Sequence, residues 1–371
     1  MIYFDNAATT YPKPASVAKA LAYAVTSVGG NPGRSGHEMS VRAAREVYKV
    51  RRAAAELFGS KEENTVFTLN CTHSLNLAIK GILKEGDHVI ISSLEHNSVA
   101  RPVCALMKKG VECSVFDVYE DDGQTLEGLK RLIKNNTKAV VCTVASNVTG
   151  RVLPINEIAA LCRDKGIVLV CDGAQAVGVM PLKVGNGINF LCMPGHKGLY
   201  GPTGTGLLVS DGEYELSTII EGGTGTTSTE TEQTPVMPEK LESGTLNTVG
   251  IVALGKGIEF VKKAGLDRIH KSEEKLCSRL INKLSQMNGV TVYRDKGSYL
   301  PIVAFNVKNM HSSEVADYLS SRGFALRGGY QCAAVAHKYL GTLENGVVRF
   351  SPSVFNNESQ VDMLCESIKN L

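Results

Sequence analysis

Short apolar stretches alternate with helix-like segments between residues 64 and 210, and this alternation limits the possible folds more than any other feature. Two of the stretches, 139–142 (AVVC) and 167–171 (IVLVC), are apolar along their whole length rather than at every second residue. Strands that are apolar on both faces are typical of a parallel sheet covered by helices on both sides. The sequence therefore predicts an α/β fold with a mostly parallel central sheet.

The pattern changes near residue 250. Long amphipathic helices are expected at 251–265 and 267–287, followed by short strands at 290–295 and 301–307. We therefore expect a large domain over residues 16–245, a smaller α+β domain over residues 246–371, and an N-terminal segment, residues 1–15, that joins the small domain. A further helix is expected at 40–59, with an apolar face formed by Val41, Ala44, Val47, Tyr48, Val50 and Leu57.

The composition is typical of a globular protein, with 371 residues that are 43% hydrophobic and 21% charged. The net charge is only +3 and no long basic block occurs, so we expect neither nucleic acid nor a membrane surface as a partner. The N-terminus lacks the basic and apolar regions of a signal peptide, which favours the cytoplasm. The ten cysteines form no CxxC pair or zinc-ligand spacing, so we expect free thiols in a reducing compartment and no metal site.

Polar residues follow five consecutive predicted strands. In open α/β sheets ligands bind at the carboxyl ends of the strands, so these side chains are candidates for one site. Each has a simpler explanation as a helix cap, a turn residue or a structural histidine, but together they supply an anion site, a flat ring, an amide, a carboxylate and a lysine. Pyridoxal phosphate requires this combination. The residues are Thr72 and His73, His96, Asn147, Asp172 and Gln175, and His196 and Lys197.

Lys197 lies between glycines at the end of an apolar stretch, in the segment GHKG at 195–198. Taken alone, this segment is explained at least as well by an exposed lysine in a polar loop. A lysine held in a dry cleft would have a lowered pKa and could react with a carbonyl group. The polar residues at the other strand ends favour this second interpretation.

Six segments of the chain resemble the class V aminotransferase family. They occur in the same order as in the family, and the resemblance extends from Tyr3 to about Asn356. Within this family they are similar to group II of the cysteine desulfurase and selenocysteine lyase branch. The resemblance implies a fold-type-I transferase that depends on pyridoxal phosphate and forms a homodimer with its sites at the subunit interface. The segments are YFDNAATT (3–10), EHNS (95–98), SNVTG (146–150), CDGAQAVG (171–178), GHKGLYGPTGTG (195–206) and RGGYQCA (327–333).

The resemblance also implies a role for each cofactor-binding residue. Lys197 would bind the aldehyde of the cofactor, Asp172 would pair with the pyridinium nitrogen, and His96 would stack on the ring and take part in catalysis. Gln175 would hydrogen-bond the phenolic oxygen, with Asn147 close by. The phosphate would be held by Thr72, His73 and His196, and by Thr226 from the other subunit.

The reaction implied by the resemblance depends on Cys332. This cysteine follows two glycines in a polar segment, where a thiolate nucleophile is favoured, although a stray exposed thiol is the simpler explanation. Cys332 would take sulfur from L-cysteine, release alanine and carry a persulfide, which makes the protein a sulfurtransferase. The substrate would be bound by Arg349 and Arg327, with Asn147, and by Arg34 and His37 at the entrance to the site.

Two departures from the family pattern leave the substrate open. Gln331 occupies the position that is usually histidine in close relatives, and the segment 350–357 (FSPSVFNN) differs as well. L-selenocysteine or another cysteine derivative is an alternative substrate, and a C–S β-lyase or a transaminase is an alternative activity. A non-catalytic sulfur carrier would require a degraded site. The short segment around Cys332 resembles the group that passes sulfur or selenium to a protein acceptor.

Overall fold

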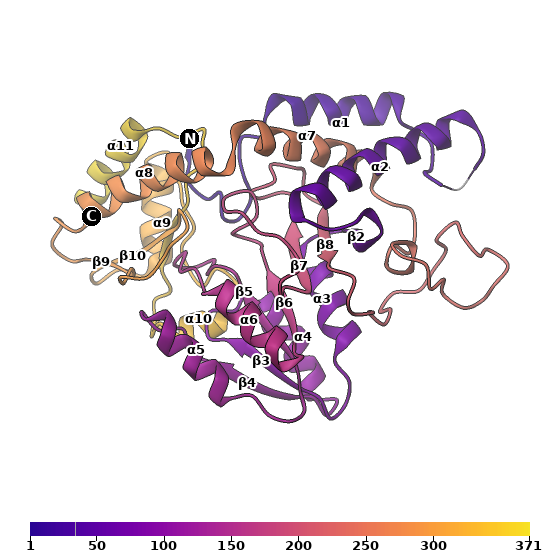
Figure 1. The fold of residues 1–371 in the computed structure, drawn as a ribbon. Helices are drawn as coiled ribbons and strands as arrows, with labels where there is room; N and C mark the ends of the chain where they lie inside the picture. The colour runs from indigo at the N-terminus through magenta and orange to yellow at the C-terminus, as the bar shows by residue number, and fades with distance from the viewer. Residues whose placement is uncertain (34) are drawn as a thin grey trace.

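A seven-stranded sheet forms the centre of the computed structural model, which describes residues 1–33 and 35–371 (Figure 1). The strand order is β2-β8-β7-β6-β5-β3-β4. β8 runs antiparallel to both of its neighbours, and the other adjacent strands run parallel, which confirms the predicted mostly parallel sheet. The strands are β2 (Thr65–Thr68), β3 (His88–Ser92), β4 (Glu112–Phe116), β5 (Thr137–Thr143), β6 (Val168–Asp172), β7 (Phe190–Pro194) and β8 (Gly206–Ser210).

Apart from the edge strand β4, both faces of this sheet are buried, because successive side chains of a strand point to opposite faces and each face meets a layer of helices. Val140 and Leu169 pack into one apolar cluster, while their neighbours Val141 and Val170 pack into another. The first cluster includes residues of α2, α5, α6 and α7, and the second includes residues of α3 and α4. The helices are α1 (Ala15–Ser27), α2 (Glu38–Phe58), α3 (Cys71–Ile82), α4 (Asn97–Met107), α5 (Asp122–Arg131), α6 (Ile155–Lys165) and α7 (Thr248–Ala264), with 3-10 turns η1 (Glu62–Asn64) and η2 (Glu239–Leu241).

The predicted helix at 40–59 is present as α2, but its predicted apolar face is wrong in part. The side of α2 that packs on the core carries Val47, Val50 and Phe58. Val41 and Tyr48 lie on its outer side, where they are 37% and 53% exposed. The sequence pattern grouped six apolar residues onto one face, whereas the protein leaves two of them, Val41 and Tyr48, exposed.

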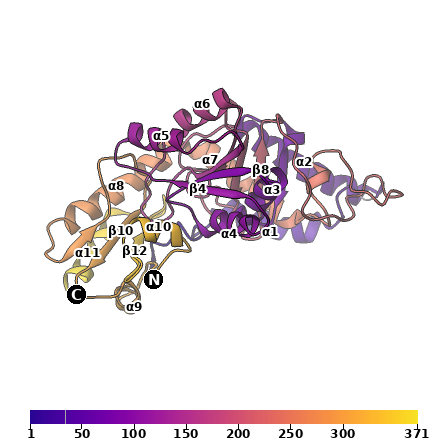
Figure 2. The same ribbon diagram turned by 90° about the horizontal axis from the view of Figure 1, so that it is seen from below.

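The C-terminal part of the chain forms a second layered unit beside the sheet (Figure 2). A three-stranded antiparallel sheet has the order β12-β10-β9, and the two-residue strand β1 pairs in parallel with β11. Phe4 packs on Phe350 with ring centroids 4.6 Å apart, so both ends of the chain share one apolar cluster. The elements are β1 (Ile2–Tyr3), β9 (Val290–Val292), β10 (Val303–Val307), β11 (Phe324–Ala325), β12 (Val348–Phe350), α8 (Leu266–Leu284), α9 (Ser312–Ser321), α10 (Ala334–Tyr339) and α11 (Glu358–Lys369).

α7 packs against α1 and α2 on the outside of the central sheet, although it follows the expected boundary at residue 245. The division of the chain into domains at residues 15 and 245 stays a prediction. Within the described part of the chain, no helix combines the length and hydropathy needed to cross a bilayer.

Candidate active site

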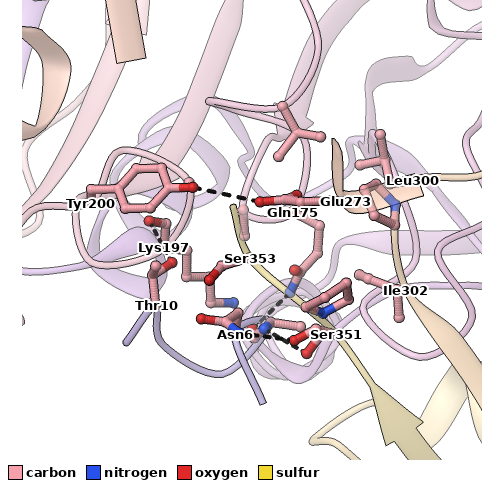
Figure 3. Close-up of a pocket in the computed structure, with 16 residues that line it drawn as sticks. Asn6, Thr10, Gln175, Lys197, Tyr200, Glu273, Leu300, Ile302, Ser351 and Ser353 are labelled. Carbon is pink, nitrogen blue, oxygen red and sulfur yellow. Dashed lines mark hydrogen bonds between the residues drawn. The ribbon is translucent and has the colours of Figure 1, made fainter. Parts of the chain in front are cut away.

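Lys197 follows the end of β7, and the N-terminal segment of the chain fixes its backbone. The Thr10 hydroxyl donates a hydrogen bond to the Lys197 carbonyl at 2.9 Å, as Figure 3 shows. Lys13 Nζ donates to the carbonyl of the preceding His196 at 2.6 Å, and the Thr10 backbone N–H donates to the same oxygen. A turn outside the sheet is therefore held by residues almost 190 positions away in sequence.

The glycine after the lysine is required by a close backbone approach. A Cβ atom on Gly198 would lie 2.0 Å from the carbonyl oxygen of Val177, and one on Gly178 would lie 2.0 Å from the carbonyl oxygen of Gly198. No side chain fits at this separation. The glycines beside Lys197 thus allow the turn to pack against the segment that follows β6.

The environment of Lys197 favours its neutral amine. Burial lowers the pKa of Lys197, and the negative charge of Asp172 opposes this shift. A partly buried lysine with a lowered pKa can act as a nucleophile and as a base. The structure therefore disfavours the alternative of a solvated loop lysine.

Lys197 and Gln175 line one pocket together with Asn6, Ser351 and Glu273. In Figure 3 the ends of the Lys197, Gln175 and Asn6 side chains point toward one another. Gln175 Nε2 donates to the carbonyl of Ala7 at 3.2 Å, so one of its two amide hydrogens is already used. The other remains for a ligand.

Asp172 is the last residue of β6 and is 2% exposed. Its Oδ1 accepts hydrogen bonds from the backbone N–H of Ala174 at 2.9 Å and from the thiol of Cys71 at 3.4 Å. These donors fix the carboxylate at the edge of the sheet.

His96 caps the N-terminus of α4 and is held by its first turn. Its Nδ1 accepts from the backbone N–H of Ser98 at 3.0 Å, and the Ser98 hydroxyl also bonds the Thr72 hydroxyl at 2.9 Å. Burial lowers the pKa of His96 to about 4, and the charges of Asp172, Lys197, Arg327 and Arg349 also act on it. The ring is therefore neutral at pH 7, and the charged residues of the site converge around it.

Two further histidines carry buried ring nitrogens that find no hydrogen-bond partner in the described part of the chain. These are His73 Nε2 and His196 Nδ1. His73 Nδ1 accepts from the backbone N–H of Leu69, so its Nε2 carries the hydrogen and is a donor. His73 also lies in the first turn of α3, where backbone N–H groups and the helix dipole favour an anion.

Two arginines lie side by side where the C-terminal sheet meets this edge. Arg349, 1% exposed in β12, donates from Nη2 to Asp5 Oδ1 at 2.6 Å and from Nη1 to the Asn147 carbonyl at 2.9 Å. Its Nε has no partner among the described residues. The Arg327 backbone bonds that of Arg349, and Arg327 Nη2 lies 3.4 Å from Cys332 Sγ.

The loop that carries Cys332 is tied to the strand ends at two points. The backbone carbonyl of Cys332 accepts a hydrogen bond at 2.8 Å from the backbone N–H of Asn97, the residue directly after His96. The carbonyl of Gln331 accepts from Asn147 Nδ2 at 2.7 Å, and Asn147 Oδ1 stays buried without a partner in the described residues. The Cys332 side chain is exposed. The tertiary fold thus brings Cys332 to the same edge as His96 and Asn147.

Two of the predicted site residues, Thr226 and His37, are not brought into this cluster. Thr226 lies in the long segment between β8 and α7, which projects away from the central sheet in Figure 1, and its hydroxyl bonds that of Thr224. His37 caps α2 and its Nδ1 accepts from the Ser40 backbone N–H. Arg34 lies outside the described residues. Their predicted roles stay predictions.

The residues around the site that we did not predict include Asp5, Asn6, Cys71 and Ser98, together with Ser351 and Glu273 of the pocket. Asp5 and Asn6 stand in the segment YFDNAATT, so a polar pair directly after the apolar residues 2–4 was the available signal. Cys71 and Ser98 occupy the first turns of α3 and α4, next to predicted residues. Sequence periodicity carries no information about such neighbours across the fold.

Comparison with known proteins identifies the family to which the chain belongs. A model of the aminotransferase class-V family matches residues 2–364. A probable cysteine desulfurase of Methanothermobacter thermautotrophicus is 32% identical over all of this chain and 94% of its own length. A probable cysteine desulfurase of Pyrococcus abyssi is 31% identical over all of this chain and 95% of its own length.

Solved structures agree in fold along the whole chain. The apo structure of a cysteine desulfurase from Thermococcus onnurineus superposes with a TM-score of 0.92 at 31% identity, covering 100% of this chain and 94% of that one. The cysteine desulfurase CsdA of Escherichia coli gives a TM-score of 0.89 at 26% identity, covering 99% of this chain and 94% of that one. These likenesses confirm the expected fold-type-I architecture, and the chain belongs to the aminotransferase class-V family.

Proposed function

We propose that this protein is a cysteine desulfurase that depends on pyridoxal phosphate, takes sulfur from L-cysteine and holds it as a persulfide on Cys332. One observation carries the proposal. The exposed Cys332 lies in a loop whose backbone is bonded to Asn97 and Asn147, next to the strand ends that carry His96, Asp172 and Lys197. The relatives named cysteine desulfurases support this assignment.

The residues present fit pyridoxal phosphate. Lys197 would hold its aldehyde, Asp172 its pyridinium nitrogen and His96 its ring face, while Gln175 keeps one amide hydrogen for the phenolic oxygen. The phosphate would be held by the first turn of α3 with Thr72, by His73 Nε2 and by His196 Nδ1, the two buried ring nitrogens without a partner in the described residues. When bound, the cofactor supplies an electron sink that stabilises negative charge at the α-carbon of an amino acid.

Arg349 is suited to bind the substrate carboxylate. Its Nη atoms are held by Asp5 and by the Asn147 carbonyl, so the guanidinium plane is fixed, and its Nε is a buried donor without a partner in the described residues. A fixed guanidinium binds a carboxylate with directional, charge-assisted hydrogen bonds. Arg349 would thus orient the amino acid at the edge of the sheet.

Lys197 and Cys332 then divide the chemistry. The Lys197 amine, whose pKa burial lowers, takes the proton from the α-carbon onto Nζ. The Cys332 thiolate, next to the Arg327 guanidinium, forms a bond to the substrate sulfur while the bond between that sulfur and Cβ breaks. Cβ takes up a proton, Lys197 Nζ returns a proton to the α-carbon, alanine leaves, and Cys332 retains the sulfur as a persulfide.

The test is alanine production from L-cysteine with a thiol reductant present, in the wild type and in Cys332→Ala. Alanine that depends on Cys332 supports the proposal. Equal alanine from both proteins contradicts it for this substrate, and the assay is then repeated with L-selenocysteine. Release of pyruvate and ammonia in place of alanine indicates a C–S β-lyase instead.

We further propose that the protein is a cytoplasmic homodimer that passes sulfur to a protein acceptor. The exposed outer side of α2, with Val41 and Tyr48, offers apolar surface for a second copy, and Thr226 would then serve the partner's site. Ten free cysteines suit a reducing compartment. Exposure of the Cys332 side chain leaves its sulfur within reach of an acceptor.

A further inference from the structure

Cys332 has an unusual backbone that something in the structure must maintain. Gln331 has φ of 44° and Cys332 has φ of 57°, so two consecutive non-glycine residues lie in the left-handed region. This region is disfavoured for residues with a Cβ atom, and such pairs persist only where surrounding contacts enforce them. The glycines at 328 and 329 precede this turn and contribute no rigidity of their own.

The Gln331 side chain provides contacts that enforce this backbone, in addition to the bonds from Asn147 and Asn97. It is 2% exposed, whereas the next side chain, Cys332, is exposed. Gln331 Nε2 donates to the carbonyls of Arg327 at 3.2 Å and Val347 at 3.0 Å. The side chain therefore points into the protein and ties both the start of the loop and the neighbouring strand segment to one amide.

His337 completes this arrangement from α10. Its Nε2 lies 3.1 Å from Gln331 Oε1, and its Nδ1 lies 2.7 Å from the Thr342 hydroxyl. Both amide hydrogens of Gln331 are used by carbonyls, so Oε1 must accept from His337, which places the hydrogen of the ring on Nε2. The Thr342 hydroxyl then donates to Nδ1. Burial lowers the pKa of His337, so the neutral ring that this scheme needs is the stable form.

We propose that His337 is a positioning residue that acts through Gln331 to hold the Cys332 thiol at the edge of the sheet. The consequence for the reacting atom is direct. With the Gln331 side chain fixed, the backbone carbonyl of Gln331 accepts a hydrogen bond from Asn147, and the backbone carbonyl of Cys332 accepts one from Asn97. The sulfur of Cys332 then lies beside Arg327. This inference rests on the proposed function, because it concerns the thiol that would receive the sulfur.

The experiment compares three replacements of His337. A glutamine places an amide nitrogen about where histidine Nε2 lies and can still donate to Gln331, whereas an asparagine reaches only as far as Nδ1. His337→Gln should therefore restore function that His337→Asn and His337→Leu lose. Thr342→Val removes only the hydroxyl that donates to His337, so it should reduce the rate of alanine release by less than His337→Asn does. This variant tests the positioning role if His337→Leu does not fold. His311→Asn, at a half-buried helix cap, is the matched control.

Two measurements are made on each cofactor-loaded protein. We expect the single-turnover rate of alanine release to fall about 100-fold in His337→Asn, with the KM for L-cysteine nearly unchanged, because displacement of a reacting group by about 1 Å has an effect of this size. Hydrogen exchange of the segment 326–334, measured with and without cofactor, should be faster in His337→Asn and near the wild-type rate in His337→Gln.

Equal rates in the wild type and His337→Asn would overturn the proposal, and so would an equal loss in His337→Gln and His337→Asn. Cys332→Ala is measured in parallel. If that variant still makes alanine, the proposed function fails, whatever the His337 variants do. If alanine depends on Cys332 and the His337 variants behave alike, the positioning role alone fails.

Discussion

The two halves of the candidate active site are built in different ways. Asp172 ends a buried strand of the central sheet, and Lys197 and His96 follow two others. Asp172 and His96 are fixed by backbone N–H groups in adjacent turns. Cys332 lies on a loop of the C-terminal unit in a disfavoured backbone conformation, held by side-chain hydrogen bonds from Gln331 and Asn147. The sheet edge is positioned by the fold itself, whereas the thiol depends on a few polar contacts that single substitutions can remove.

This difference suits the two tasks that the proposed reaction requires. Proton removal needs a base whose pKa and position stay fixed, and a buried lysine provides both. Transfer of sulfur to an acceptor needs a thiol that is exposed after it has reacted. An exposed loop with a buried anchor can serve both the internal and the external step.

The largest effect should separate the two halves completely. Lys197→Ala removes the base, so exchange of the α-hydrogen of L-alanine with D2O, followed by NMR, should fall by about 10³-fold. Cys332→Ala should leave this exchange near the wild-type rate while abolishing alanine production from L-cysteine. If both variants lose the exchange, the two residues do not act in separate steps.

A smaller effect should come from the arginine that joins the halves. Arg349→Lys keeps the charge but loses the planar guanidinium that is bonded to Asp5 and Asn147, so kcat/KM for L-cysteine should fall by about 100-fold, mainly through KM. Asp5→Asn should give a weaker loss, because it releases the guanidinium without removing it. The half-buried pair of Arg279 and Asp362 in the C-terminal unit provides the control Arg279→Lys, in which KM should not change. A loss confined to kcat would argue against carboxylate binding.

A third effect concerns stability against pH. Burial lowers the pKa values of His96 and His196 to about 4, whereas both protonate near pH 6.5 in the unfolded chain. Between pH values of about 4 and about 6.5, both rings are therefore neutral in the folded protein and protonated in the unfolded chain. The unfolded state binds more protons in this window, so the free energy of unfolding should decrease as the pH falls from about 6.5 to about 4. Urea unfolding at several pH values measures this slope. The slope should be shallower in His196→Asn, and an unchanged slope would show that His196 does not contribute.

The smallest effect should come from Cys71, whose thiol donates to Asp172. Cys71→Ser keeps a donor and should retain activity, whereas Cys71→Ala should lower kcat by less than about tenfold, since a thiol is a weak donor. Cys277→Ala, at a buried cysteine of α8, controls for the loss of volume. Equal activity in Cys71→Ala and the wild type would show that Ala174 alone is enough to hold Asp172.

The sequence by itself determined the architecture and the strand-end half of the site. Continuous apolar stretches such as 167–171 require burial on both faces, which only a helix-covered parallel sheet provides, and the carboxyl ends of such strands meet at one edge. The positions of His96, Asp172 and Lys197 follow from this rule. Local pattern also predicted a helix over 40–59, but not which of its apolar residues stay exposed, because exposure depends on what packs against each face.

Only the tertiary structure decided the other half. The contacts of Asp5 with Arg349 and of Asn147 with Gln331 join residues separated by 344 and 184 positions, and no local pattern encodes such pairs. The inward direction of Gln331 depends on the carbonyls of Arg327 and Val347 and on His337, which come together only when the C-terminal unit is folded. Hydrophobic periodicity specifies which side chains must be buried, whereas hydrogen-bond partners across the chain are set by the packed geometry.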